Sequence, residues 1–191
     1  MGSDPVAALY LALLHHPVYD KNGAVVTTAV TNLDVHDLAR LARTFDLAAC
    51  YIATPVPTLR RLVLRIVRHW ETGPGATYNE TRREALARIR LAGDLDGVIA
   101  DIEREAGALP RLVATTAREG GTRLSFAALR ARLAVETRPE LLILGTGWGL
   151  TGELLGRADD VLEPIRGSDG WNHLSVRTAA AIILDRLRAG R

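Results

Sequence analysis

The fold is decided by the stretch Leu141-Leu142-Ile143-Leu144-Gly145-Thr146-Gly147-Trp148-Gly149-Leu150, in which an apolar segment runs directly into alternating glycines. Consecutive branched apolar residues are typical of a strand buried on both faces of a parallel sheet. Glycines after such a strand permit positive φ and leave no Cβ, so a ligand could approach the main-chain amides. The bare pattern is equally typical of a tight turn. It lacks the spacing of a nicotinamide-dinucleotide fingerprint and the Lys-Ser/Thr pair of a P-loop, which disfavours both.

Short apolar runs alternate with helical patterns along the rest of the chain. We expect strands at 7–14, 48–53, 89–92, 111–115, 140–144 and 161–162, and helices at 33–45, 57–70, 95–106, 126–134, 150–155 and 174–188. This alternation predicts an α/β fold with a parallel sheet flanked by helices, in which ligands bind beyond the carboxyl ends of the strands. The chain has 191 residues, 48% of them hydrophobic, and no evident linker, so we expect one domain over residues 1–191.

Composition argues against several other classes of protein. The longest apolar run, residues 6–14, is about half the roughly 20 residues that a membrane span needs, and no basic segment precedes it as in a secretory signal. We therefore expect a cytoplasmic protein with no membrane partner. Cys50 is the single cysteine, which excludes an intramolecular disulfide and a cysteine-cluster metal site. His15 and His16 have no evident third ligand, so no metal is expected.

Positive charge is concentrated in one part of the chain. All but one of the 24 basic residues are arginine, and residues 57–90 hold eight arginines against three glutamates although the net charge of the chain is only +2. Arg61, Arg65 and Arg68 recur at helical spacing on one face. Such a face is either simply solvated or binds the phosphate backbone of a nucleic acid.

Two further segments carry polar groups at the predicted ends of strands. Residues 162–176 form a long irregular connection rich in polar side chains, a kind of loop that often carries function. Residues 26–40 bring together hydroxyl, amide, carboxylate, imidazole and guanidinium groups. Asn32 or Asp34 could simply cap a helix there, but a general base and a charge-stabilising cation could also come from this corner. The candidate catalytic residues are Asn32, Asp34, His36 and Arg40.

The three segments at 26–40, 141–150 and 162–176 resemble those of the SPOUT superfamily of RNA methyltransferases. They resemble more closely a bacterial group of stand-alone S-adenosylmethionine-dependent proteins. The resemblance extends nearly from end to end. The matching stretches are LYLALLHHPVYDKNGAVVTTAVTNLDVHDLARLART, LVATTAR, LLILGTGWGL, VLEPIRG and NHLSVRTAAAIILDRL.

The resemblance implies a parallel sheet whose C-terminal part is tied in a deep trefoil knot, the SPOUT fold, which general rules of topology would not predict. It also implies that S-adenosylmethionine is held bent in the knot by three loops, with Leu144, Ile165 and Leu174 around the adenine ring. The implied cofactor-binding residues are Thr115, Thr116, Ala117, Leu144, Gly145, Thr146, Gly147, Trp148, Gly149, Leu162, Ile165, Arg166, Gly167, His173, Leu174 and Ser175.

The catalytic residues are less well defined by the resemblance. Arg40, counted back from Phe45, matches the arginine of the branch that methylates the ribose 2′-hydroxyl. That branch has a glutamate where this chain has Gly147 and an asparagine where it has Ser175. A base-methylating mechanism therefore stays open, in which Asp34 or Asp37 removes a ring proton, as does a mechanism with His36 as the base.

These observations predict an S-adenosylmethionine-dependent RNA methyltransferase that acts on tRNA, with Arg61, Arg65 and Arg68 as RNA-binding residues. The alternative is a non-catalytic RNA-binding or assembly module that has kept the fold. We also expect a homodimer, since the last helix presents an apolar stripe that something must cover and the family pairs subunits near the knot. The stripe consists of Val176, Ala180, Ile183 and Leu187, and the other possibility is that it packs inside its own subunit.

Overall fold

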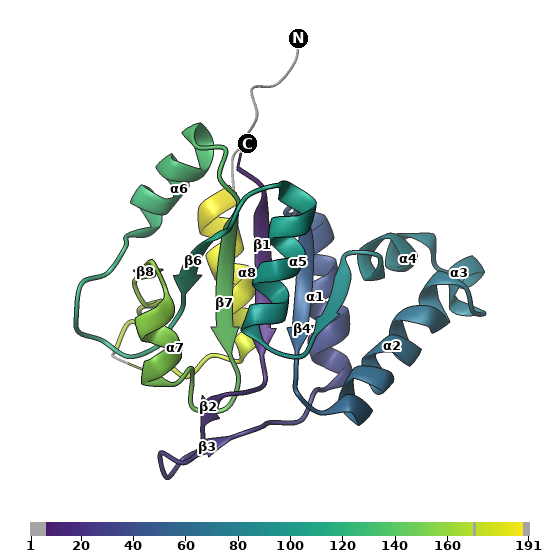
Figure 1. The fold of residues 1–191 in the computed structure, drawn as a ribbon, viewed down its shortest axis with the longest axis horizontal. Helices are drawn as coiled ribbons and strands as arrows, with labels where there is room; N and C mark the ends of the chain where they lie inside the picture. Colours follow the sequence, from purple (N-terminus) through teal and green to yellow (C-terminus); the bar gives the residue numbers. More distant parts are fainter. Residues whose placement is uncertain (1–6, 170, 189–191) are drawn as a thin grey trace.

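The computed structural model describes residues 7–169 and 171–188, which form the α/β fold shown in Figure 1. Its centre is a six-stranded parallel sheet with the strand order β5-β4-β1-β7-β6-β8. The strands are β1 (Leu9–Leu14), β4 (Ala49–Ala53), β5 (Ile89–Ala92), β6 (Arg111–Ala114), β7 (Glu140–Gly145) and β8 (Asp160–Val161). The predicted α/β class with a parallel sheet is confirmed.

Helices cover both faces of the sheet. In the view of Figure 1, α5 lies in front of the strands, whereas α1 and α8 lie behind them. Leu9, Leu11 and Leu13 of β1 join the core beneath α1, α6 and α8, and the alternate residues join the core beneath α5 and α7. The helices on the two faces are α1 (Asn32–Thr44), α6 (Phe126–Val135) and α8 (Val176–Arg188), and α5 (Leu95–Ala106) and α7 (Gly152–Arg157).

Three further helices extend the molecule at the β5 end of the sheet (Figure 1). They are α2 (Pro57–Glu71), α3 (Gly75–Tyr78) and α4 (Glu80–Leu86). Proline is favourable at the first position of α2, because its missing N–H would have no partner there. Val63 and Val67 of α2 and Leu86 of α4 are buried with α1 in the same core. One face of α2 therefore packs on the core of the domain, and its opposite face is exposed.

A short hairpin lies at the carboxyl edge of the sheet. Strands β2 (Val18–Tyr19) and β3 (Val25–Val26) pair antiparallel. The main chain of Tyr19 accepts a hydrogen bond from Trp148 N and donates one to the Gly149 carbonyl, both at 2.9 Å. The hairpin therefore supports the glycine loop after β7.

The apolar stripe of α8 is covered inside its own subunit. Ala180, Ile183 and Leu187 are at most 4% exposed, and Val176 packs against the same core. The stripe therefore gives no argument for a second subunit, and our reason for expecting a dimer was wrong. Among residues 7–169 and 171–188, no helix is long and apolar enough to cross a membrane.

Candidate active site

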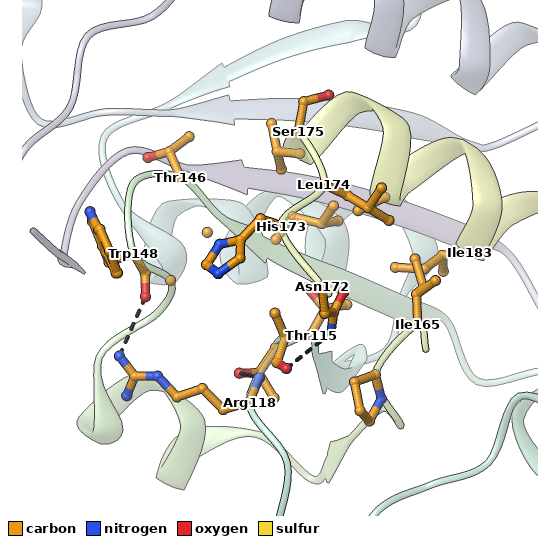
Figure 2. A pocket seen from close by; sticks show the side chains of 18 of the residues that line it. Thr115, Arg118, Thr146, Trp148, Ile165, Asn172, His173, Leu174, Ser175 and Ile183 are labelled. Carbon is orange, nitrogen blue, oxygen red and sulfur yellow. Dashed lines mark hydrogen bonds between the residues drawn. The ribbon is translucent and has the colours of Figure 1, made fainter. Parts of the chain in front are cut away.

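A cavity of about 660 Å³ lies beyond the carboxyl ends of β6 and β7 (Figure 2). Its volume falls within the range of small-molecule sites. The three cofactor loops implied by the resemblance converge on it, because parallel strands bring their carboxyl ends to one edge of the sheet. Most of the implied cofactor-binding residues line it, namely Thr115, Thr116, Ala117, Leu144, Gly145, Thr146, Gly147, Trp148, Gly149, Ile165, His173, Leu174 and Ser175.

Three implied cofactor residues do not line this cavity. Leu162 is 1% exposed and belongs to the core of the domain. Arg166 is exposed, and its Nε atom lies 3.6 Å from a carboxylate oxygen of Glu119. A Cβ on Gly167 would lie 2.4 Å from the carbonyl oxygen of Trp171, so a side chain there would collide with the loop itself.

Several lining residues were missed by sequence reasoning. Arg118 donates a hydrogen bond to the Trp148 carbonyl at 3.4 Å, and its guanidinium lies 5.3 Å from the centre of the Tyr19 ring. Asn172 donates to the Ala117 carbonyl at 3.0 Å, which joins the first and third loops (Figure 2). Arg118 directly follows the predicted first loop, so its position was the available signal. The other missed residues are Val176, Ala179 and Ile183, whereas Glu163 and Pro164 belong to the stretch 162–167 already expected to form the third loop.

Two glycines of the second loop, Gly145 and Gly147, leave no room for a side chain. Gly147 has a φ of 60°, and a Cβ there would lie 2.8 Å from the Tyr19 carbonyl oxygen. A Cβ on Gly145 would lie 2.8 Å from the main-chain nitrogen of Leu150. The positive φ expected in this loop is thus present at Gly147, and close contacts within the chain give both glycines a structural reason as well.

The cavity has two chemically different sides. Ile165, Leu174 and Ile183 form an apolar side, and Thr146, Trp148 and His173 lie across from them (Figure 2). The centroids of the Trp148 and His173 rings are 6.4 Å apart. Within the described residues, the main-chain N–H groups of Thr116, Ile165 and Leu174 donate no hydrogen bond. An apolar slot with free main-chain donors fits a flat heterocycle with a polar edge, such as adenine.

A buried histidine is connected to the glycine loop by a series of hydrogen bonds. His15 is fully buried at the end of β1, and its Nδ1 atom lies 3.1 Å from the Thr28 hydroxyl. The Thr28 hydroxyl is hydrogen-bonded in turn to that of Thr146, and Thr146 Oγ1 donates to the Leu14 carbonyl at 3.2 Å. Burial lowers the pKa of His15, which favours the neutral ring.

Asp34 makes structural contacts in the first turn of α1. Its buried carboxylate accepts hydrogen bonds from the Thr31 hydroxyl at 2.6 Å and from Arg177 Nη1 of α8 at 2.8 Å. The Thr31 hydroxyl also accepts from Asp34 N, so the two residues form a capping box. Asp37, the alternative carboxylate, lies 3.2 Å from Arg177 Nε. Both carboxylates are therefore paired with the same arginine.

The other catalytic candidates lie on the far side of α1. Asn32 and His36 line a second cavity, of about 560 Å³, between α1 and α2. Arg40 is exposed and follows Asn32 by eight residues, about 12 Å along the helix. None of the four candidates lines the first cavity. The structure thus separates Asn32 and His36 from Asp34.

The three arginines of the predicted RNA patch are exposed on α2. Within the described residues, the side chains of Arg61, Arg65 and Arg68 make no hydrogen bond or ion pair. Arg88 and Arg90, from the same basic segment, are instead paired with Asp46 and Glu105. In the described residues, no carboxylate therefore lies within ion-pair distance of these three arginines. In the part of the chain that the structure describes, no three His, Cys, Asp or Glu residues are grouped so that they could hold a metal.

Comparisons with known proteins agree with this arrangement. The model of a family described as SAM-dependent RNA methyltransferase matches residues 8–189. The chain is 46% identical over 183 residues to a protein of Nitratidesulfovibrio vulgaris named tRNA (guanine-N(1)-)-methyltransferase, and covers 42% of that protein. It is also 42% identical over 179 residues to an uncharacterized protein of Aquifex aeolicus, of which it covers 87%. The chain thus spans less than half the length of its named relative.

Solved structures show the same fold. The structure of TrmJ from Zymomonas mobilis has a TM-score of 0.60 at 15% identity, with 97% of this chain and 70% of that chain covered. An AdoMet-bound rRNA methyltransferase from Sinorhizobium meliloti has a TM-score of 0.53 at 16% identity, with 96% and 56% covered. At these identities the likeness establishes the fold alone.

Proposed function

The chain belongs to the family of S-adenosylmethionine-dependent RNA methyltransferases, and we propose that it transfers the methyl group of this cofactor to a nucleotide of tRNA in the cytoplasm. The observation that carries the proposal is the cavity at the carboxyl edge, on which loops from β6, β7 and β8 converge with the start of α8.

The residues of the cavity fit S-adenosylmethionine. Ile165, Leu174 and Ile183 would enclose the adenine ring, and the free N–H groups of Thr116 and Ile165 are available to its polar edge. The bound cofactor supplies a methyl group on a positively charged sulfur, which makes the leaving group a good one. The protein then has to position the two reactants and exclude water.

The arginine patch supports RNA as the substrate. Phosphate contacts dominate the affinity of proteins for nucleic acids, and arginine pairs with phosphate through a planar fork of donors. Arg61, Arg65 and Arg68 stand unpaired on one exposed face of α2. We assign them to the RNA backbone.

Arg40 is our proposal for a charge-stabilising residue in the reaction. It is exposed and carries no ion pair within the described residues, so it is free to contact RNA. Arg40→Ala should lower single-turnover methylation about tenfold at saturating RNA, with cofactor affinity unchanged. A wild-type rate would make Arg40 an ordinary helix residue and pass the role to Asn32, Asp34 or His36.

We do not assign to this chain the guanine that the name of the bacterial relative gives as its target. This chain covers only 42% of that relative, whose guanine-N1 activity belongs to the whole protein. A second candidate function is a non-catalytic RNA-binding module that has kept the fold. The position of Asn32, Asp34, His36 and Arg40 outside the first cavity favours that alternative.

Tritiated methyl transfer separates the two candidates. The protein is incubated with tritiated S-adenosylmethionine and total RNA from a strain that lacks its gene. We expect tritium in the tRNA fraction, and mass spectrometry of the nucleosides would identify the methylated nucleotide. Cofactor binding without tritium in any RNA would contradict the enzyme and support the binding module.

We further propose that the C-terminal part of the chain is knotted. Leu162 N donates to the Ala114 carbonyl, and on the other side Leu124 N donates to the Val161 carbonyl. The end of β8 is thus flanked by both ends of the loop formed by residues 115–123. The chain that continues to α8 would pass through this loop before α8 packs on α1 and α6. This arrangement supports a threaded chain.

We also propose that the chain forms a homodimer where α1 and α8 begin. Leu33 and Leu174 are 59% and 41% exposed, and the Asp34–Arg177 pair holds the two helix starts together. Neighbouring exposed apolar residues mark interaction sites. Light scattering should give twice the monomer mass of 20.7 kDa for the wild type and the monomer mass for Leu33→Glu. A monomeric wild type would contradict the dimer.

A further inference from the structure

The groove between α1 and α2 is lined by Arg65 of the arginine patch, but the function proposed above gives the rest of the groove no ligand. We propose that this groove holds one unstacked base of the RNA, adjacent to the nucleotide that is methylated. The inference rests on the proposed function, because it takes RNA to be the substrate.

The walls of the groove suit a flat heterocycle. Leu62, Ile66 and Trp70 provide apolar surface, and Leu62 is 44% exposed although it is a large aliphatic residue. His69 lies beside Trp70, with the two ring centroids 5.2 Å apart. Single-stranded RNA is bound in this way, with unstacked bases against aromatic and apolar side chains.

Polar groups at the groove are available to the edge of a base. Within the described residues, the side-chain amide of Asn32 makes no hydrogen bond. The ring of His36 makes none either, and its Nδ1 atom is buried without a partner. Burial and next Arg82 lower the pKa of His36, which favours the neutral ring with both a donor and an acceptor. An amide and a neutral imidazole can each pair with the donor and acceptor pattern of a base.

The charge around the groove favours a polyanion. Arg65 lines the groove and continues the patch formed with Arg61 and Arg68, and no lining residue is acidic. A strand whose phosphates lie on this patch would bring a base to the groove. The same surface is unfavourable for a purely apolar protein segment, because the arginines would lose hydration without gaining partners.

The groove lies close to the cofactor cavity. Asp34 contacts Arg177 on one side of the first turn of α1, and Arg177 directly follows Val176, which lines the cofactor cavity. Asn32 of the same turn and His36, about one turn further along α1, line the groove beside α2. Since the two cavities flank one helical turn, neighbouring nucleotides of one strand can occupy both.

A pair of RNA probes isolates the contribution of the bases. One probe is a fluorescently labelled 12-nucleotide RNA of mixed sequence, and the other is the same ribose–phosphate strand without bases. Both carry equal charge, so the ratio of their dissociation constants measures base recognition alone. We expect the first probe to bind the wild type at least about fivefold more tightly. Asn32→Ala and His69→Ala should bring this ratio close to one.

Control variants distinguish base recognition from general affinity. Arg61→Gln, outside the groove, should weaken both probes equally and leave their ratio unchanged. Equal affinities of the wild type for the two probes, or a ratio unchanged by both groove variants, would overturn the inference. Methyl transfer to total tRNA is measured on the same preparations. Methyl transfer together with equal dissociation constants for the two probes would contradict the base site in the groove but not the proposed function. A high ratio of the dissociation constants without methyl transfer would contradict the proposed function but not the base site.

Discussion

Asp34 holds the first turns of α1 and α8 together, since its carboxylate is bound both by the Thr31 cap and by Arg177. The residue is 4% exposed, so these bonds are largely shielded from water. A general base needs a free lone pair directed at the substrate. The contacts of Asp34 therefore favour a structural role over proton removal.

Replacement of Asp34 should lower stability more than it lowers the chemical rate. Asp34→Ala removes the carboxylate half of the capping box and leaves Arg177 without its inner partner, which we expect to lower the free energy of unfolding by about 2 to 4 kcal/mol. Urea denaturation measures this loss, with Asp37→Ala as the control because its carboxylate is 43% exposed. An Asp34→Asn protein that keeps its stability and methylates a hundred times more slowly would instead identify Asp34 as the base.

His15 should make the stability of the protein dependent on pH. Burial lowers its pKa from the ordinary value of 6.5 in the folded state, so below that pH the unfolded chain binds more protons than the folded one. Stability should therefore fall as the pH drops below about 6.5, by up to about 1.4 kcal/mol per pH unit until the lowered pKa is passed.

Denaturation at two pH values tests this expectation for His15. His15→Phe removes the titrating group and keeps a ring of similar size. The difference in unfolding free energy between pH 7.5 and pH 5.5 should be smaller in the variant than in the wild type, to which His36 also contributes. An equal difference in both proteins would show that His15 does not couple protons to folding.

Most helices and strands could be predicted from local periodicity. The predicted helix at 95–106 and strand at 89–92 coincide with α5 and β5, because Asp94 and Gly107 cap the helix and the strand is a short apolar run. The β2–β3 hairpin was missed, since two-residue strands carry no periodic signal. No element was predicted between residues 70 and 89, and the structure forms α3 and α4 there.

The site could be predicted only in part. The glycine loop after a buried strand and the polar connection at 162–176 are visible in the sequence, and the resemblance supplied the loop at 115–117. Periodicity does not encode which side of α1 faces which neighbour. That is why Asn32, Asp34 and His36 were grouped in one corner, whereas the packing of α8 and α2 on opposite sides of α1 separates them.

Helix α2 should carry much of the salt dependence of RNA binding. Replacing Arg61, Arg65 and Arg68 together with glutamine removes charges that are unpaired within the described residues and leaves the buried Val63 and Val67 in place. We expect weaker binding and a salt slope lower by about 0.7 to 0.9 for each lost phosphate contact. Fluorescence anisotropy with total tRNA at several salt concentrations measures both.

A control must remove positive charge from elsewhere on the surface. The Arg104→Gln and Arg157→Gln double variant does so on α5 and α7, where each arginine is paired with an aspartate. Its salt slope should equal that of the wild type. If the triple variant of α2 also keeps the wild-type slope, its arginines form only a solvated face.

At the scale of the whole molecule, the strand order creates the site. β1 lies between β4 and β7, so the polar segment after β1 and the glycine loop after β7 meet at one edge. The end of β8 lies between Ala114 and Leu124, which brings the third loop against the first. Neither arrangement follows from the order of elements along the chain, and together they produce the cavity proposed to hold the cofactor.

Calorimetric titration of S-adenosylmethionine into the wild type and Gly147→Val tests the proposed cofactor site most directly. Valine at this position would meet the Tyr19 carbonyl and a positive φ, so the loop would have to move. Gly156→Ala is the matched control, because its Cβ would meet nothing within 4 Å. We predict one cofactor per chain for the wild type and the control, and at least about tenfold weaker binding for folded Gly147→Val. Wild-type affinity in folded Gly147→Val would contradict the account.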